Sequence, residues 1–290
     1  MWKRINWKAV LYTVIWVISL SGLGVLMGFI EQKKEAVICK DVKVLIPGTQ
    51  SFIERKEIDQ ILLQNKGPLI GRKLNLINIH EIEDELKANP FIEYAKVYAD
   101  MDGIITVRIK QREPVLRILN SENQDFYVDI NGLKIPTSEN FTAEVLVANG
   151  MIAEHFSNKV DTLKTQMAKD LYHTAMFIRN DTLWNNQIEQ IYVNTKKEIE
   201  LVPRVGNQKI ILGSADSLDV KFRNLLAFYK KALPKVGWDT YKTINVKYAN
   251  QIVCEKTKTD SSKTTKVNPD LQVIIADSIK TGNTDTTKIQ

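Results

Sequence analysis

One long uncharged segment near the start of the chain constrains its fold most. The segment runs from Ala9 to Ile30, between Lys8 and Glu31. As a helix it would be about 33 Å long, close to the thickness of the hydrocarbon core of a bilayer. A helix on the surface of a soluble domain shows a polar face, and this segment has none. We therefore expect a membrane-spanning helix over residues 9–30, which anchors the rest of the chain.

Positive residues on the N-terminal flank predict the orientation of the span. Lys3, Arg4 and Lys8 crowd a short N-terminal segment, and positive charge beside a span tends to stay in the cytoplasm. We expect residues 1–8 to be a cytoplasmic tail and the bulk of the chain to lie across the membrane. A cleaved secretory signal is the alternative, but the residues before Glu31 offer no convincing small-x-small cleavage site.

Two glycines inside the span have the spacing of a helix-association motif. Gly24 and Gly28 form a G-x-x-x-G pair, which lets two helix backbones approach closely. We expect association through this face, and ordinary transmembrane glycines are the alternative.

The length and composition of the chain limit what the part outside the membrane can be. About 260 residues remain there, enough for two domains of ordinary size. The formal charge of +6 is spread over scattered lysines rather than a basic stripe with aromatics, so nucleic-acid binding is not indicated. Cys39 and Cys254 are too few for a disulfide scaffold. We expect two separate thiols, with a bridge in an oxidising compartment as the alternative.

Hydrophobic periodicity predicts an α+β module over residues 36–113. The expected elements are a strand at 41–46, a helix at 54–64, a helix starting after residue 78, and strands at 93–99 and 104–111. Asn78 and Glu81 form a capping box for the second helix. Its acidic residues, Glu83 among them, are expected on the solvated face. Two helices would then cover one face of a small sheet.

Residues 114–255 form a second, strand-rich pattern. Strands are expected at 115–119, 126–130, 145–148, 198–202, 209–212, 243–248 and 251–255, and amphipathic helices that pack on the sheet at 162–179 and 217–233. The tail at 256–290 has few large apolar residues and is expected to be disordered.

The sequence contains no motif for catalysis, a cofactor or a metal. The three histidines lack metal-ligand spacing, residues 67–73 lack the spacing of a phosphate loop, and the G-x-S-x-G frame is missing at Ser214. We therefore expect no catalytic, cofactor or metal residue and no small-molecule substrate. The chain is predicted not to be an enzyme.

Three short motifs carry a resemblance to a known family. A β-α-α-β-β module directly after one N-terminal span resembles a POTRA domain. Residues 89–97 (NPFIEYAKV), 111–115 (QREPV) and 127–132 (YVDING) are similar to segments of the FtsQ/DivIB family of bacterial division proteins. Residues 100–103 depart from the Trp-Pro turn of many members. The similarity runs from the anchor to about Glu255, and its motifs are structural rather than catalytic.

The second motif contains a candidate joint between the two domains. Pro114 cannot donate to a ladder, while Arg112 and Glu113 offer charges that could fix the joint. The alternative is a solvated strand end.

The resemblance implies a scaffold role in bacterial cell division. It implies a single-pass protein of the cell inner membrane at the division septum, with a periplasmic C-terminal bulk and with FtsB and FtsL as partners. One alternative is a membrane-tethered envelope enzyme with an unrecognised site. Another is a POTRA-type envelope assembly or transport component, against which the lack of a series of barrel strands argues.

The resemblance also places a partner site on the last strands. Residues 247–253 (KYANQIV) are similar to the C-terminal segment near which the family binds FtsB by pairing strands. Tyr248, Asn250, Gln251 and Val253 are the predicted binding residues, because an uncovered edge strand offers backbone groups for β-augmentation. The alternative is an ordinary edge blunted by charges such as Lys247 and Glu255.

Overall fold

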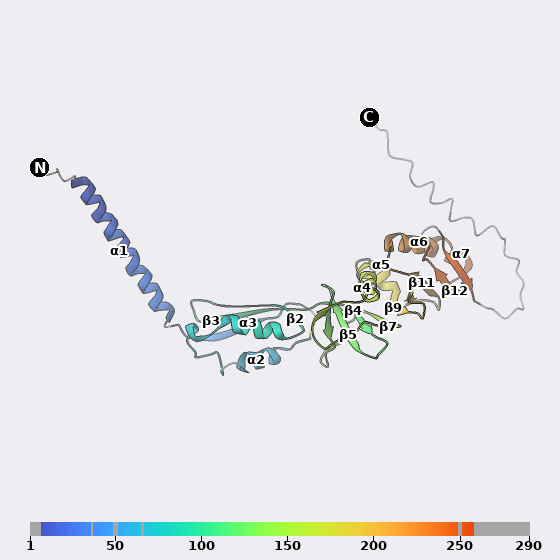
Figure 1. Ribbon diagram of the computed structural model, residues 1–290, viewed down its shortest axis with the longest axis horizontal. Coiled ribbons are helices and arrows are strands. Elements are labelled where there is room, and N and C mark those ends of the chain that lie inside the picture. Colours follow the sequence, from blue (N-terminus) through green and yellow to red (C-terminus); the bar gives the residue numbers. More distant parts are fainter. Residues whose placement is uncertain (1–6, 36, 49–51, 65–66, 249–250, 258–290) are drawn as a thin grey trace, which may run out of the picture. The chain divides into compact units, whose positions relative to one another are not determined.

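The computed structural model describes residues 7–35, 37–48, 52–64, 67–248 and 251–257 (Figure 1). Helix α1 (Trp7–Glu35) contains the predicted span. Among the described residues, it is the one helix long and apolar enough to cross a membrane, over Val10–Met27 with a mean hydropathy of 2.1. None of that stretch is buried inside the protein. A helix that is apolar on every side and has no protein around it is suited to lipid.

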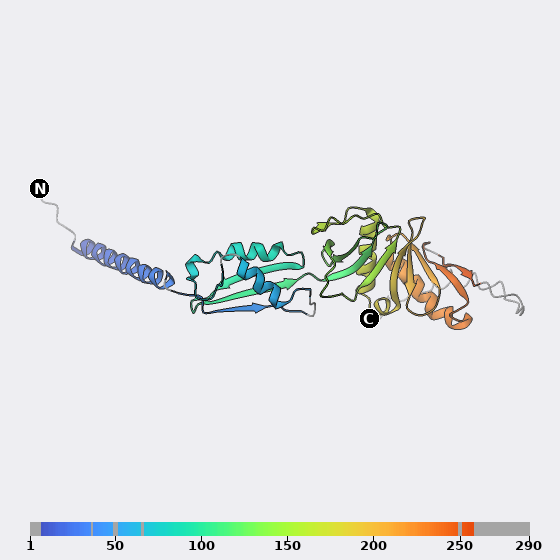
Figure 2. The ribbon, with the colours of Figure 1, turned by 90° about the horizontal axis from the view of Figure 1, so that it is seen from below.

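The chain after α1 divides into two compact units between Arg112 and Glu113. The first unit holds a three-stranded sheet. Its elements are β1 (Asp41–Leu45), α2 (Arg55–Gln64), the 3₁₀ helix η1 (Leu74–Leu76), α3 (Ile79–Ala88), β2 (Ile92–Ala99) and β3 (Ile104–Gln111). Strand β3 is central, with β1 parallel on one side and β2 antiparallel on the other. Figure 2 shows α2 and α3 over the strands.

Every second residue of the central strand β3 from Ile105 to Ile109 is apolar and lies in the core of this unit. Ile105, Val107 and Ile109 are fully buried and belong to one cluster with Ile58 of α2 and Leu86 of α3. Successive side chains of a strand point to opposite faces, so every second residue can be apolar and meet the helices. The β-α-α-β-β order expected from the sequence is confirmed.

Helix α3 both confirms and corrects the sequence analysis. The Asn78 side chain accepts a hydrogen bond from the Glu81 amide at 3.3 Å, so the predicted N-cap is confirmed. The expectation that Glu83 is solvated was wrong, because only 4% of the surface of Glu83 is exposed. Its carboxylate accepts a hydrogen bond from the Val97 amide at 2.8 Å and pairs with the Lys96 ammonium at 3.0 Å.

The second unit holds a ten-stranded mixed sheet. Its strands are β4 (Pro114–Leu119), β5 (Asp125–Asp129), β6 (Leu133–Pro136), β7 (Leu146–Gly150), β8 (Asp161–Thr162), β9 (Ile188–Val193), β10 (Ile199–Pro203), β11 (Lys209–Gly213), β12 (Tyr241–Asn245) and β13 (Val253–Lys256). They lie in the order β13-β12-β11-β10-β9-β7-β4-β5-β6-β8. The predicted α+β class with a strand-rich second part is confirmed.

The described residues of this unit form four helices, rather than the two expected. They are α4 (Gln166–Arg179), α5 (Thr182–Gln187), α6 (Leu218–Lys231) and α7 (Leu233–Val236). Aromatic contacts join α4, α5 and α6: Phe177 of α4 stacks on Phe222 of α6 at 4.8 Å, and Trp184 of α5 meets the same ring edge-on at 5.1 Å. Helix α4 begins later than predicted, because Thr165 caps it and residues 161–162 form β8.

A buried ion pair ties the long segment after β7 to this unit. Lys134 and Glu154 are 2% and 1% exposed, with the ammonium 2.7 Å from Glu154 Oε1. The same carboxylate accepts hydrogen bonds from the Thr165 amide at 2.8 Å and the Thr165 hydroxyl at 2.7 Å. Burial raises the pKa of Glu154, but the hydrogen bonds from Lys134, Thr165 and Lys164 outweigh burial and leave that pKa below its usual value. This carboxylate therefore fixes the start of α4.

Candidate interaction surface

Strand β13 ends the ten-stranded sheet and is its last described element. In the sheet formed by the described residues it pairs with β12 alone, in an antiparallel register that sets Ile244 opposite Cys254 and Asn245 opposite Val253. One row of backbone groups on β13 therefore faces away from the sheet. Such an edge can accept a further strand.

The hydrogen bond after β13 tells which amides face outward. The Thr257 amide donates to the Thr240 carbonyl at 3.0 Å, so it points toward β12. Backbone groups of successive residues in an antiparallel strand alternate between its two sides. The Glu255 amide thus also points toward β12, whereas the amides of Cys254 and Lys256 point away from it. These outward groups are the ones a partner strand would bond.

The structure corrects the strand bounds on which the predicted binding residues were placed. Strand β12 ends at Asn245, whose side chain accepts a hydrogen bond from the Lys247 amide at 3.1 Å. Tyr248 and Gln251 consequently lie in the connection between β12 and β13, and Val253 is the one predicted residue on a strand. The prediction for Asn250 lies outside the described residues.

Tyr248 and Val253 are both accessible, with 44% and 48% of their surface exposed. The Cys254 side chain packs against the core of the unit instead, and burial raises the pKa of its thiol to about 11. We refer to Tyr248, Val253 and the outward amides of Cys254 and Lys256 as the β13 edge. It combines an aromatic side chain, an aliphatic one and unsatisfied strand groups, the chemistry of β-augmentation.

Lys247, the residue before Tyr248, is partly exposed and makes an ion pair within the second unit. Its ammonium lies 2.9 Å from Glu198 Oε1 and 5.3 Å from the centre of the Tyr248 ring. Asn194 donates a hydrogen bond to the other oxygen of Glu198 at 3.3 Å. The hydrogen bond from Lys247 holds the pKa of Glu198 below its usual value. Lys247 is thus engaged by Glu198, and it orients Tyr248 by a cation–π contact.

Each predicted joint residue takes part in the structure of its own unit. In the first unit, the Arg112 guanidinium donates to the Pro90 carbonyl at 3.1 Å. In the second, the Glu113 carboxylate pairs with Arg179 of α4, and Pro114 begins β4. Their role as a joint remains a prediction.

The predicted helix-association residues, Gly24 and Gly28, both lie in α1. A Cβ built on Gly24 would meet nothing within 4 Å. The backbone there is therefore accessible to another helix, and association through it also remains a prediction.

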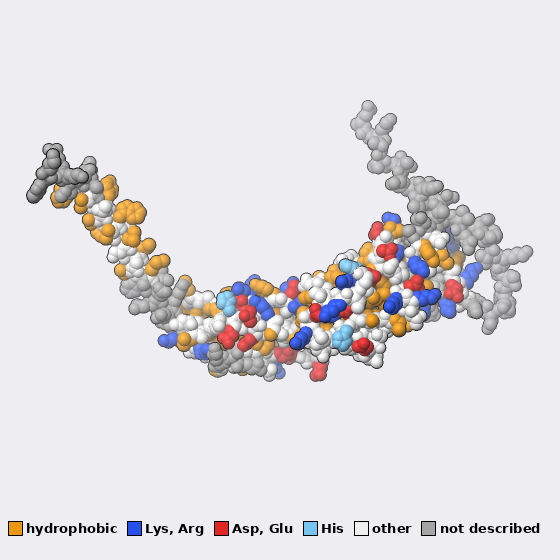
Figure 3. Space-filling model, viewed as in Figure 1, with side chains coloured by type: hydrophobic (Ala, Val, Ile, Leu, Met, Phe, Trp, Pro, Cys, Tyr) orange, Lys and Arg blue, Asp and Glu red, His pale blue; other side chains and the backbone are white. Residues whose placement is uncertain are grey.

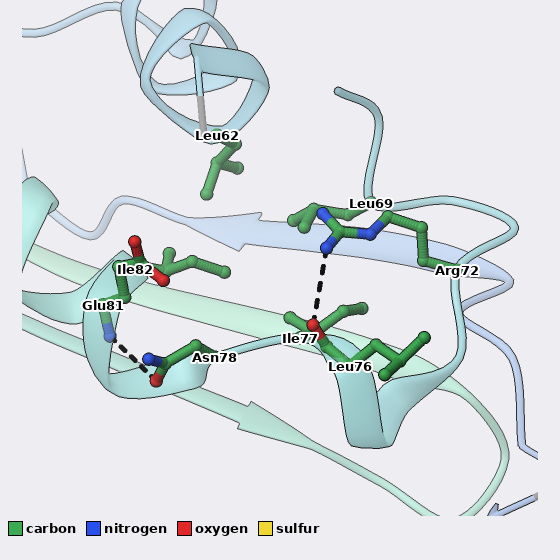
Figure 4. A pocket seen from close by; sticks show the side chains of 8 residues that line it. All are labelled: Leu62, Leu69, Arg72, Leu76, Ile77, Asn78, Glu81 and Ile82. Atoms are coloured by element: carbon green, nitrogen blue, oxygen red, sulfur yellow. Dashed lines mark hydrogen bonds between the residues drawn. The ribbon is translucent and has the colours of Figure 1, made fainter. Parts of the chain in front are cut away.

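The first unit contains a small pocket, which is an alternative candidate site (Figure 4). It lies between α2 and the loop before α3 and has a volume of about 20 Å³. It is lined by Leu62, Leu69, Arg72, Leu76, Ile77, Asn78, Glu81 and Ile82. That volume holds about one water molecule, so the pocket has no room for an organic substrate.

Metal-ligating groups and stripes of like charge are other features that could mark a site. Within the ranges that the structure describes, no group of three or more His, Cys, Asp or Glu side chains is placed to hold a metal ion. On the face drawn in Figure 3, acidic and basic side chains are interspersed over both units.

The polar contacts around the β13 edge were not found from the sequence. Glu198 lies 49 positions from Lys247, and no local spacing connects them. The sequence signal for the edge is the polar composition after Glu255: a segment with few large apolar residues is not expected to cover the last strand.

Two family models match the chain, one for each unit. Residues 37–110 match a POTRA-like domain, and residues 113–255 match the FtsQ/DivIB C-terminal related domain. These matches define a protein with a POTRA-like domain followed by a β domain of the division-protein type. The chain belongs to the FtsQ/DivIB family of cell division proteins. A search of curated proteins found no similar relative.

Proposed function

We propose that the chain is a single-pass membrane scaffold of the bacterial division machinery. Its N-terminus would lie in the cytoplasm and its two units in the periplasm, at the division septum. Membership of the FtsQ/DivIB family implies participation in a division complex with protein partners. The finer proposal is that proteins resembling FtsB and FtsL bind at the β13 edge.

The observation that carries this proposal is the one-sided pairing of β13. A bound strand would bond the outward groups of Cys254 and Lys256 and bury the exposed surface of Tyr248 and Val253. Backbone pairing supplies affinity in this mode, and side chains beside the seam supply specificity. Tyrosine is well suited to the second task, because its ring is rigid and its hydroxyl can remain hydrated.

Co-purification from membranes tests the backbone part of the proposal. Lys256→Pro removes one outward amide but no bond to β12, and Lys256→Ala is its matched control because both lose the same exposed side chain. We expect Lys256→Pro to abolish capture of the partner and Lys256→Ala to keep it. Equal capture by both variants, with both folded by circular dichroism, would place the interface elsewhere.

Tyr248 tests the side-chain part. Tyr248→Ala is expected to weaken capture with little change in folding, because the ring is largely exposed. Tyr248→Phe keeps the ring and should retain most of the binding. If Tyr248→Ala and Tyr248→Phe bind alike, the ring makes no contact with the partner.

A further inference from the structure

One end of the first unit is bonded to the segment that directly follows α1. The Leu74 amide donates to the Val37 carbonyl at 3.0 Å, and Cys39 exchanges backbone hydrogen bonds of 2.7 Å with Gly71 and Arg72. On the other side, the Lys40 amide donates to the Gly103 carbonyl at 2.8 Å. We refer to residues 37–40, 70–76 and 100–103 as the anchor-side end.

A glycine allows the hairpin turn at 100–103 to pack closely against residues 37–40. Gly103 has φ +90°, and a Cβ there would lie 2.3 Å from the Ile38 carbonyl oxygen. Only a residue without a side chain fits such an approach. The turn at 100–103 is therefore packed directly against residues 37–40.

Chain length keeps the anchor-side end close to the bilayer. Val37 follows the last residue of α1, Glu35, by two positions, which span at most about 7 Å. The helix continues five residues past Ile30, which adds about 7.5 Å. The headgroup layer is itself about 5–7 Å thick on each side. Val37, where the domain begins, thus lies within about 10 Å of the outer boundary of the headgroups.

The side chains on this end suit an interface with lipid. Four large apolar residues are exposed there: Ile38, Ile70, Leu76 and Met101, by 45%, 58%, 67% and 77%. A contiguous patch of exposed apolar side chains marks a protein or membrane interaction site, whereas single exposed residues need no explanation. Figure 4 shows Leu76 beside Arg72, whose guanidinium donates to the Leu76 carbonyl at 3.4 Å.

Cations accompany these apolar residues. Lys40, Arg72 and Lys73 lie on the same segments as Ile38 and Ile70. Asp100 and Asp102 are in the hairpin turn, where the Asp100 carboxylate accepts the amides of Asp102 at 3.0 Å and Ile104 at 2.8 Å. Basic residues beside a span attract anionic headgroups, each contributing on the order of 1 kcal/mol.

We propose that the anchor-side end rests on the outer surface of the bilayer that holds α1. Ile70, Leu76 and Met101 enter the interfacial layer, while Lys40, Arg72 and Lys73 contact the phosphates of anionic phospholipids. This contact rests on the proposed span of α1. It holds the POTRA-like domain at a fixed height above the membrane.

The test uses the full-length chain in nanodiscs that contain phosphatidylglycerol with a photoactivatable headgroup. Crosslinked residues are mapped by mass spectrometry. We expect crosslinks at the outer end of α1 and at residues 70–76 and 101. The double substitution Ile70→Glu/Leu76→Glu should lower the crosslinks at 70–76 and 101 at least threefold and leave those on α1 unchanged.

Tyr94→Glu is the matched control. Tyr94 is 47% exposed on β2, about 20 Å along the strand from the turn, so its substitution should change nothing. The unmodified chain provides a second comparison, since replacing phosphatidylglycerol by a zwitterionic lipid with the same photoactivatable group should also lower the crosslinks at 70–76. Two results would overturn the lipid contact alone. One is crosslinks on α1 with none at 70–76 or 101. The other is crosslinks at 70–76 and 101 that neither the double substitution nor the zwitterionic lipid lowers. Absence of crosslinks on α1 would overturn the span.

Discussion

Glu83 shows how one side chain protects a sheet edge in the first unit. In the sheet that the described residues form, β2 pairs with β3 alone, so its outward amides would otherwise be exposed. The Glu83 carboxylate accepts the Val97 amide at 2.8 Å, and Lys96 neutralises it at 3.0 Å. The hydrogen bond from Val97 lowers the pKa of Glu83 despite burial. The edge of β2 is therefore partly closed, unlike that of β13.

Glu83→Ala should destabilise the first unit by about 1–3 kcal/mol, because it leaves a buried amide without an acceptor. Glu83→Gln keeps an acceptor oxygen and should cost less. Denaturant unfolding of residues 36–257 measures both. If Glu83→Ala costs no more than the exposed-site control Glu85→Ala, the Val97 hydrogen bond contributes nothing to stability.

The same carboxylate predicts a pH dependence. A folded-state pKa below the ordinary value of 4.5 means that the carboxylate adds stability above that value and loses it as the pH falls through the folded pKa. The free-energy difference between the unmodified chain and Glu83→Gln should therefore shrink below about pH 4.5. A difference that stays constant from pH 7 to pH 3 would contradict the depressed pKa.

The buried pair in the second unit predicts a non-additive result. Lys134→Met leaves the Glu154 charge buried without its cation, which costs about 3–5 kcal/mol. Adding Glu154→Gln removes that charge while keeping an acceptor for Thr165, so the double variant should be more stable than Lys134→Met alone. A double-mutant cycle measures the coupling, and additive losses would show that the two side chains act independently.

At the scale of elements, the helices and strands that bury one face against the core and expose the other to solvent could be predicted from the sequence. Strands β2 and β3 and helix α3 were found because burial imposes a clear period on their residues. Strand β6 was missed because its buried Lys134 interrupts the apolar pattern. Strand β9 was missed because it follows α5 without a turn, and its buried residues Ile188, Ile191 and Val193 are unevenly spaced.

The candidate site was predicted in outline and corrected in detail. The sequence placed a partner-binding edge at the end of the folded chain, and β13 is an edge strand of the described sheet. That a partner binds there stays a prediction. It also extended the preceding strand to Tyr248, because Thr243 to Tyr248 alternates well. The Asn245 side chain ends that strand by bonding the Lys247 amide, a competition between side chain and ladder that periodicity does not report.

At the scale of the whole molecule, the apolar helix and two folded units suit a protein that works across a membrane. Lys3, Arg4 and Lys8 predict a cytoplasmic N-terminus, although residues 1–6 lie outside the described ranges. A reporter that is active only outside the cytoplasm, fused after Gln290, should therefore be active. Activity of a cytoplasmic reporter at that position, with silence of the first, would reverse the topology.

Residue-resolved hydrogen exchange tests strand addition at β13 most directly. The amides of Cys254 and Lys256 face away from β12, whereas those of Glu255 and Thr257 face it. Exchange is compared in the purified chain with and without the co-purified partner. We predict that the partner slows exchange at Cys254 and Lys256 at least tenfold and changes Glu255 and Thr257 much less. Binding that leaves Cys254 and Lys256 exchanging as before would contradict strand addition at this edge.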